Sequence, residues 1–157
     1  MSIEMRPIGV VETDVADADI AHQRRKMISK IRIFEEYAEG LTGITDYSHI
    51  IVLFWMHRAE GSANLLIHPR GNSELPLTGV LASRGRGHPN PIGFAVVDLI
   101  NRTGNRLKVR RLDAYDGTPI IDIKPYDRYD MYTELRMPQW LNNRFTRHQS
   151  ENPQSGG

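Results

Sequence analysis

The sequence predicts a mainly β protein: a single antiparallel β-barrel with a few short helices and a helical C-terminal segment. Three observations lead to this prediction. Short runs rich in β-forming residues follow one another with turn residues between them, as in all-β domains. Helical patterns are few, and no regular βαβ alternation occurs, which argues against a doubly wound sheet. The run HIIVLFWMH at residues 49–57 is apolar at odd and even positions alike, as expected of a strand covered on both faces.

Length and composition restrict the class of protein. The 157 residues suit one domain with its own core; we predict that domain over residues 1–150 and a disordered tail over 151–157. The net charge of +1 gives no overall attraction to nucleic acid or membrane, so such functions must rest on local clusters. Cysteine is absent, which excludes disulfides, thiolate metal ligands and a cysteine nucleophile. Neither a signal peptide nor a membrane-spanning run is evident, so we expect a soluble, cytoplasmic protein with no membrane attachment.

The N-terminal part predicts a strand, a loop and a basic stretch. Residues 3–13 are rich in β-formers, and Pro7 marks the start of this strand or an edge position. Residues 14–21 are polar and acidic without a usable period, so we expect a loop. The stretch 21–33 holds basic side chains and no acid. It forms either a solvated face or a phosphate-facing patch, and the sequence leaves both open.

Strand and helical signals then alternate up to the middle of the chain. Residues 30–34 alternate isoleucine with basic residues, which predicts a half-buried strand. Residues 35–41 predict a helical turn that Gly40 can close, and a short helix continues the apolar face. The apolar strand at 49–57 follows. Its last residue, His57, is placed either to cap the strand end or to act as a base at a pocket rim, and the cap is favoured.

Turn residues divide the second half into short segments. Strands are expected at residues 64–69, 78–83, 92–102, 106–113 and 120–124. The third and fourth of these form a hairpin about Thr103-Gly104-Asn105. The alternation slips at Arg111-Leu112, where we expect a β-bulge. A tyrosine-rich irregular segment over 126–137 precedes a terminal helix expected over 138–148, with Pro138 in its first turn.

The loop LASRGRGHPNPIG, residues 81–93, is the most distinctive stretch of the chain. Its glycines allow close approach of the backbone to a ligand, and its prolines stiffen the second half. Arg84, Arg86 and His88 suit an anionic or polar ligand. A basic surface loop between two strands is the alternative, and these residues alone do not decide between them.

Several common chemistries find no support. The six histidines, at positions 22, 49, 57, 68, 88 and 148, form no HExxH motif or close pair with a carboxylate, so we expect no metal site. There is no GxSxG elbow, no P-loop and no dinucleotide fingerprint.

A second informative stretch is LDAYDGTPIIDIKPY at residues 112–126, which brings three carboxylates into a short span. Asp116 followed by Gly117 suits a turn in which the carboxylate bonds to the backbone. That explanation serves Asp113 less well, which leaves it as a candidate for chemistry.

Four motifs in order resemble the TsaA/TrmO (YaeB-like) family: PIGVVET, L-x-GI-x-x-YSHIIVLFWMHRA, A-S-R…PNPIG and LDAYDGTPIIDIKPY. The resemblance spans about residues 5–126. It implies an S-adenosylmethionine-dependent methyltransferase on a single antiparallel β-barrel, working as a homodimer. The implied activity is N6-methylation of N6-threonylcarbamoyladenosine at position 37 of certain tRNAs, in the anticodon loop.

The same resemblance suggests the residues that contact the cofactor. They lie in the glycine- and proline-rich loop, at the end of the apolar strand and in the aspartate-bearing segment. The expected cofactor contacts are His57, Arg58, Glu60, Gly61, Arg84, His88, Pro89, Asn90, Ile92, Asp113, Ala114, Tyr115, Asp116 and Gly117. The loop departs from the family's usual R-S-P-x-R-P-N-P-I-G at Gly85, Arg86 and His88.

The implied reaction also suggests a base and a substrate surface. The accepting nitrogen is conjugated to a carbonyl and is a poor nucleophile, so a base would help; Asp113 or Asp116 is our hypothesis. Expected tRNA contacts are Arg24, Arg25, Arg110, Arg111, Lys124 and Tyr126. Two alternatives remain: a methyltransferase of the same fold with another small or RNA substrate, and a non-catalytic module that binds RNA or S-adenosylmethionine.

Overall fold

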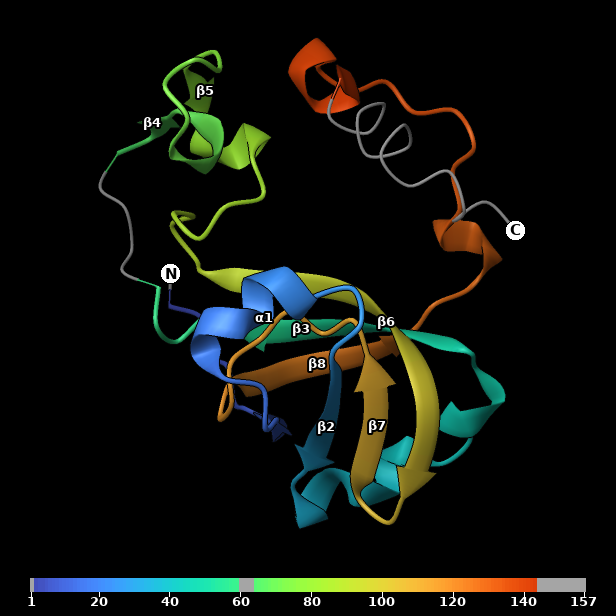
Figure 1. Cartoon of the computed structure of the whole chain (residues 1–157). Coiled ribbons are helices and arrows are strands. Elements are labelled where there is room, and N and C mark those ends of the chain that lie inside the picture. The colour runs from blue at the N-terminus through green and yellow to red at the C-terminus, as the bar shows by residue number, and fades with distance from the viewer. Residues whose placement is uncertain (1, 60–63, 144–157) are drawn as a thin grey trace.

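The computed structural model describes residues 2–59 and 64–143, and its centre is a closed six-stranded barrel (Figure 1). The strand order is β1-β2-β7-β6-β3-β8, and each neighbouring pair is antiparallel. The predicted fold class is therefore confirmed. The barrel strands are β1 (Gly9–Glu12), β2 (Ile28–Ile33), β3 (His49–Trp55), β6 (Ile92–Thr103), β7 (Arg106–Arg110) and β8 (Pro119–Pro125).

Alternate side chains of the strands fill the barrel. In β3, Ile50 and Val52 are fully buried, whereas their outward-facing neighbours are half-buried. Leu107 and Val109 from β7 and Ile31 from β2 complete the same core. Each such burial contributes roughly 1.5–3 kcal/mol. The period of two that predicted β2 therefore also governs burial in β3, whose sequence is apolar at both parities.

A short seam between β1 and β8 closes the barrel. Gly9 pairs with Ile120 and Val10 with Pro119, and the amide of Val11 donates to the carbonyl of Thr118 at 2.9 Å. On the other side of β1, a side chain at Gly9 would overlap the backbone carbonyl of Arg32. Glycine at this position lets β1 lie against β2.

The hairpin between β6 and β7 turns at Gly104, which has a φ of 61°, as the sequence predicts. The predicted bulge at Arg111-Leu112 is wrong in its position. The register shift lies in β6, between Leu99 and Asn101. Arg111 follows the end of β7 with a φ of 77°, and this left-handed residue produces the slip in alternation, since Leu112 is fully buried directly after it.

The loop predicted at residues 14–21 is also wrong, because α1 (Asp17–Gln23) occupies most of it. Asp17 and Asp19 lie in the first turn, where carboxylates interact favourably with the helix dipole. Ile20 is the one buried residue among the seven of α1, so no apolar period is visible in the sequence. The helical turn predicted after β2 is present as the 3₁₀ helices η1 (Glu35–Leu41) and η2 (Ile44–Asp46).

Two further segments extend beyond the barrel (Figure 1). In the first, β4 (Leu66–Ile67) and β5 (Thr78–Gly79) form a two-stranded sheet flanked by η3 (Pro69–Gly71) and η4 (Val80–Ala82). Both strands are shorter than predicted.

The second extension, residues 126–143, contains η5 (Arg128–Asp130), and residues 139–143 are helical. The remainder of the predicted terminal helix and the predicted tail lie outside the described residues. No helix within the described ranges is long and apolar enough to cross a membrane.

Candidate functional site

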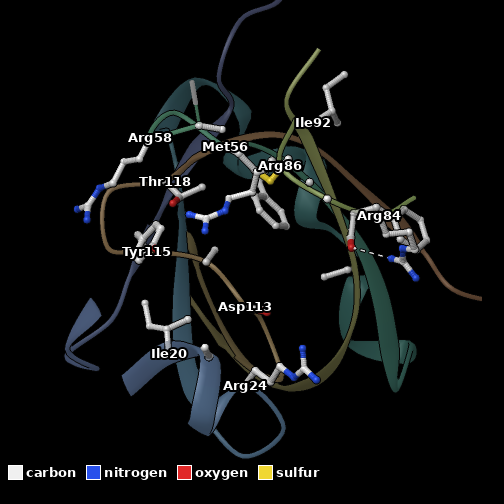
Figure 2. Close-up of a pocket in the computed structure, with 18 of the residues that line it drawn as sticks. Ile20, Arg24, Met56, Arg58, Arg84, Arg86, Ile92, Asp113, Tyr115 and Thr118 are labelled. Carbon is white, nitrogen blue, oxygen red and sulfur yellow. Dashed lines mark hydrogen bonds between the residues drawn. The ribbon is translucent and has the colours of Figure 1, made fainter. Parts of the chain in front are cut away.

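A pocket of about 690 Å³ opens at the end of the barrel that α1 covers (Figure 2). Five parts of the chain line it: α1 with the turn after it, the end of β3 with the residues that follow, Arg70 of η3, the loop 83–88 with the start of β6, and the segment 113–118. Its walls combine apolar and charged side chains. The pocket therefore lies where the two stretches singled out in the sequence, residues 81–93 and 112–126, meet.

The loop 83–88 is held in a defined conformation by its own side chains. His88 Nε2 lies 2.9 Å from the carbonyl oxygen of Ser83, and the hydroxyl of Ser83 donates to the carbonyl of Val80 at 2.8 Å. Arg84 donates to the carbonyl of Phe94 at 3.3 Å and lies over that residue's ring, 5.5 Å from its centroid. Arg86, by contrast, points into the pocket (Figure 2).

The start of β6 fits tightly against β3 at the pocket wall. Gly93 pairs with Phe54, and a Cβ at Gly93 would overlap the Phe54 ring. Both residues line the pocket. The glycine that ends the distinctive loop is thus required for close packing, and it lets an aromatic ring form part of the wall.

Asp113 lies in the pocket between two arginines, Arg24 and Arg86 (Figure 2). The left-handed Arg111 and the buried Leu112 direct the chain so that Asp113 faces the pocket. Partial burial raises the pKa of Asp113, and the positive charges of Arg24 and Arg86 oppose that rise. The residue remains open to solvent, so water screens these effects.

Arg58 joins three walls of the pocket. Its guanidinium donates to Asp17 of α1 and lies over the ring of Tyr115, 4.6 Å from the centroid. Further along, the amide of Thr13 donates to Asp116 Oδ1 at 3.0 Å. These contacts attach α1 and the chain before it to the segment 113–118.

The predicted cofactor-binding residues divide into three groups. Those that line the pocket are Arg58, Arg84, His88, Ile92, Asp113, Ala114 and Tyr115. Those outside its lining are His57, Pro89, Asn90, Asp116 and Gly117. Glu60 and Gly61 lie outside the described residues. Asp116 accepts a bond from the Thr13 amide and precedes Gly117, which has a φ of 73°, so its position supports a role in the turn and gives no support to the catalytic role predicted for it.

The predicted substrate-binding residues are more scattered. Arg24 lines the pocket, and Arg25 is exposed in the turn that follows α1. Arg110 donates to Asp98 at 2.6 Å, and Lys124 lies 2.7 Å from Asp122. Tyr126 forms an edge-to-face contact with His49. Arg111 is exposed beside the Asp98 pair. Three of the predicted cations or rings are thus already engaged with other side chains.

Sequence reasoning did not name several residues of the pocket. Asp17, Ile20, Phe54, Met56, Arg70 and Thr118 line it, and they come from elements far apart in the chain. The acids at 17 and 19 ahead of an apolar residue are a helix-start signal, which could have placed α1. Within the described residues, no group of three or more His, Asp or Glu side chains could hold a metal ion.

Comparison with known proteins identifies the family. The family model described as "tRNA-methyltransferase O N-terminal domain" matches residues 17–131. The chain belongs to this family. The match includes α1, η3, the loop 83–88 and the segment 113–118, so all five parts of the pocket wall lie within the family domain.

Individual relatives agree with the family assignment. A protein of Archaeoglobus fulgidus named "Probable S-adenosyl-L-methionine-binding protein" is 45% identical over 129 residues, which cover 80% of this chain and 34% of that protein. A second A. fulgidus protein, named "S-adenosyl-L-methionine-binding protein", is 44% identical over 125 residues, covering 78% of this chain and 88% of the relative. The chain therefore spans about a third of one relative and most of the other.

A solved structure shares the fold. The crystal structure of TrmO from Pseudomonas aeruginosa superimposes with a TM-score of 0.69 at 27% identity, covering 87% of this chain and 61% of that one. The barrel described above is therefore the TrmO barrel, and the solved protein extends beyond the length that this chain matches.

Proposed function

We propose that this protein is an S-adenosylmethionine-dependent methyltransferase that N6-methylates threonylcarbamoyladenosine at position 37 of tRNA. The observation that carries the proposal is the pocket in which Asp113 lies between Arg24 and Arg86. Membership of the tRNA-methyltransferase O family supports it. So do the relatives named for binding S-adenosylmethionine.

The residues of the pocket fit this cofactor. Ligand pockets for small molecules enclose about 300–1,000 Å³, and this one has about 690 Å³. Arg24 and Arg86 offer guanidinium donors to a carboxylate, and the carboxylate of Asp113 suits the positive charge of the cofactor. Apolar wall residues such as Phe54 and Ala114 suit the adenine ring.

The bound cofactor supplies an electrophilic methyl group, and the chain's own residues supply position and proton removal. Direct transfer needs the accepting nitrogen held in line, which is a matter of orientation. Asp113 is our candidate for the base because it faces the pocket and burial raises its pKa, which strengthens it as a proton acceptor. The positive charges of Arg24 and Arg86 favour its ionised form.

The substrate approaches from the side that carries α1 and the turn after it. Arg24 lines the pocket, and Arg25 lies on the exposed surface beside it. A tRNA nucleobase bound in the pocket would therefore place the phosphate backbone of the RNA near these cationic side chains. The homodimer predicted from the resemblance remains part of the proposal. A tRNA substrate also implies a cytoplasmic location.

The test is methyl transfer from labelled S-adenosylmethionine to tRNA from a strain that lacks the modification. We expect label on the purine beside the anticodon, and loss of that label with Asp113→Asn while calorimetry still detects cofactor binding. Label elsewhere would favour a same-fold methyltransferase with a different substrate. Cofactor or RNA binding without label would favour a non-catalytic module.

A further inference from the structure

Three residue pairs face each other across the outer surface of β2 and β7, which lie side by side in Figure 1. The register places Ile28 opposite Arg110, Lys30 opposite Lys108 and Arg32 opposite Arg106. The residues between them on each strand, such as Ile31 and Leu107, are buried. Five of these six side chains are therefore cationic and lie on one face.

Carboxylates compensate the outer two pairs. Glu12 accepts from Arg32 at 2.6 Å through one oxygen and from Arg106 at 3.1 Å through the other. Asp98 accepts from Arg110 at 2.6 Å. These contacts neutralise both ends of the row.

The middle pair has no such compensation. Lys30 is exposed and Lys108 is half-exposed, and neither makes an ion pair with an acid in the described part of the chain. Glu12 lies opposite Lys30 on β1, but both of its oxygens are engaged by arginines. Like charges directly opposite each other destabilise a sheet, so the fold gains nothing from this pair.

Further exposed cations lie on the pocket side of the Ile28–Arg110 pair. β2 starts two residues after the turn that holds Arg25 and Lys26, and both of these side chains are exposed. They line a hollow together with Arg24, which also lines the main pocket. Exposed cations therefore lie both beside the pocket and at the middle of the β2–β7 face, with the Ile28–Arg110 pair between them.

We propose that Lys30 and Lys108, with Arg25 and Lys26, form a track for the phosphate backbone of the RNA whose base enters the pocket. This inference rests on the proposed function. Lysines bind phosphates as point charges without reading sequence, which suits a surface that positions a strand. The narrow line that ends at the pocket favours a polynucleotide over an anionic membrane, which would be met by a broad patch.

The test compares Lys30→Gln/Lys108→Gln with a control, Arg6→Gln/Arg136→Gln, which loses equal charge at exposed positions outside the track. Binding of tRNA is measured by fluorescence anisotropy at several salt concentrations, and binding of S-adenosylmethionine by calorimetry. We expect the track variant to bind tRNA about five- to tenfold more weakly, with the salt slope reduced by about two. Its cofactor affinity and the tRNA affinity of the control should stay unchanged.

A second variant separates RNA binding from stability. Lys108→Glu places a carboxylate opposite Lys30, so the melting temperature should rise through a cross-strand ion pair while tRNA affinity falls further than in Lys108→Gln. A merely structural pair of lysines would not move tRNA affinity in this direction.

Three outcomes overturn the track. Equal tRNA affinity and salt slope in wild type and variants would do so while leaving the methyltransferase proposal intact. Failure of the wild-type protein to bind any tRNA would remove the track and the tRNA substrate together. Binding to vesicles of phosphatidylserine and phosphatidylcholine that the lysine variants abolish, with tRNA binding untouched, would assign the surface to membranes instead.

Discussion

Arg58 lies over the ring of Tyr115, with the guanidinium carbon 4.6 Å from the ring centroid. The same guanidinium donates to Asp17 in the first turn of α1. One side chain thus joins the residues after β3, the segment that carries Asp113, and the helix that covers the pocket. Because α1 buries one residue of its seven, this contact adds to the small apolar contact that Ile20 provides.

Asp17→Asn should therefore loosen α1 and weaken cofactor binding. An exposed ion pair is worth about 0.2–1 kcal/mol, and we expect at most roughly fivefold weaker binding of S-adenosylmethionine, with faster hydrogen exchange at residues 17–23. Asp19→Asn is the matched control, since Asp19 lies in the same first turn and is exposed. Equal effects of the two substitutions would assign the loss to the helix dipole and remove the Arg58 contact from the account.

Asp113→Asn should abolish methyl transfer and stabilise the fold at neutral pH. Burial raises the folded-state pKa of Asp113, so its ionised form is less stable in the folded protein than in the unfolded chain. Its stabilising contribution is complete below the unfolded pKa of about 3.9 and is lost as pH rises through the folded pKa. We expect a higher melting temperature than wild type at pH 7, a difference that disappears below about pH 3.9, and a rate at least about 100-fold lower.

Asp116→Asn is the competing variant for the same measurement. It weakens the turn bond from the Thr13 amide, which contributes about 0.5–1.5 kcal/mol, and should lower the melting temperature with little change in turnover. Loss of turnover in Asp116→Asn and its retention in Asp113→Asn would transfer the base role to Asp116.

Glu12→Gln should have the opposite pH dependence. Burial acts to raise the pKa of Glu12, but hydrogen bonds and positive charge from Arg106 and Arg32 lower it overall. Its contribution is therefore present above the unfolded pKa of about 4.3 and is lost as pH falls through the lower folded pKa. We expect a loss of roughly 0.5–1 kcal/mol at pH 7 by urea denaturation, shrinking toward pH 3; a loss that is constant from pH 7 to 3 would contradict the ion-pair explanation. Glu4→Gln, at an exposed position, is the control.

Gly93→Ala should destabilise the barrel at the pocket wall. A Cβ there would overlap the Phe54 ring, and forced overpacking costs about 1–3 kcal/mol. Gly85→Ala is the control, because the nearest atom to its Cβ would be Ser83 Oγ at 3.8 Å, an ordinary contact. Adding Phe54→Leu should restore part of the loss in Gly93→Ala, as coupled neighbours do. Additive losses in the double variant would show that the ring is not the cause.

Much of the barrel could be predicted because its strands and turns are visible in the local pattern of apolar, polar and glycine residues. The alternation of apolar and basic residues in β2 and the glycine turn at Gly104 needed no knowledge of distant partners. α1 shows no such pattern, because Ile20 is its one buried residue and no helical period of apolar residues can be seen. The slip at Arg111 was visible, but whether it arises from an extra residue or from a left-handed φ depends on the tertiary context that buries Leu112.

The candidate site was predictable in part, because two of the segments that line it carry recognisable local motifs. Motif resemblance located the two segments that meet in the pocket, and it named Asp113. It did not reveal that Arg110 and Lys124 are already paired with acids. Asp17 and Arg70 reach the pocket through helices that no motif covers.

The seam between β1 and β8 has a consequence for synthesis. The first strand emerges from the ribosome early, but its closing partner is complete only after Pro125 has been added. Pairing over so long a separation in the chain is slow to form, so a nascent chain that already displays the loop 83–88 and Asp113 still lacks the strand that closes the barrel. We therefore expect the nascent chain to bind its ligand only after β8 has been synthesised.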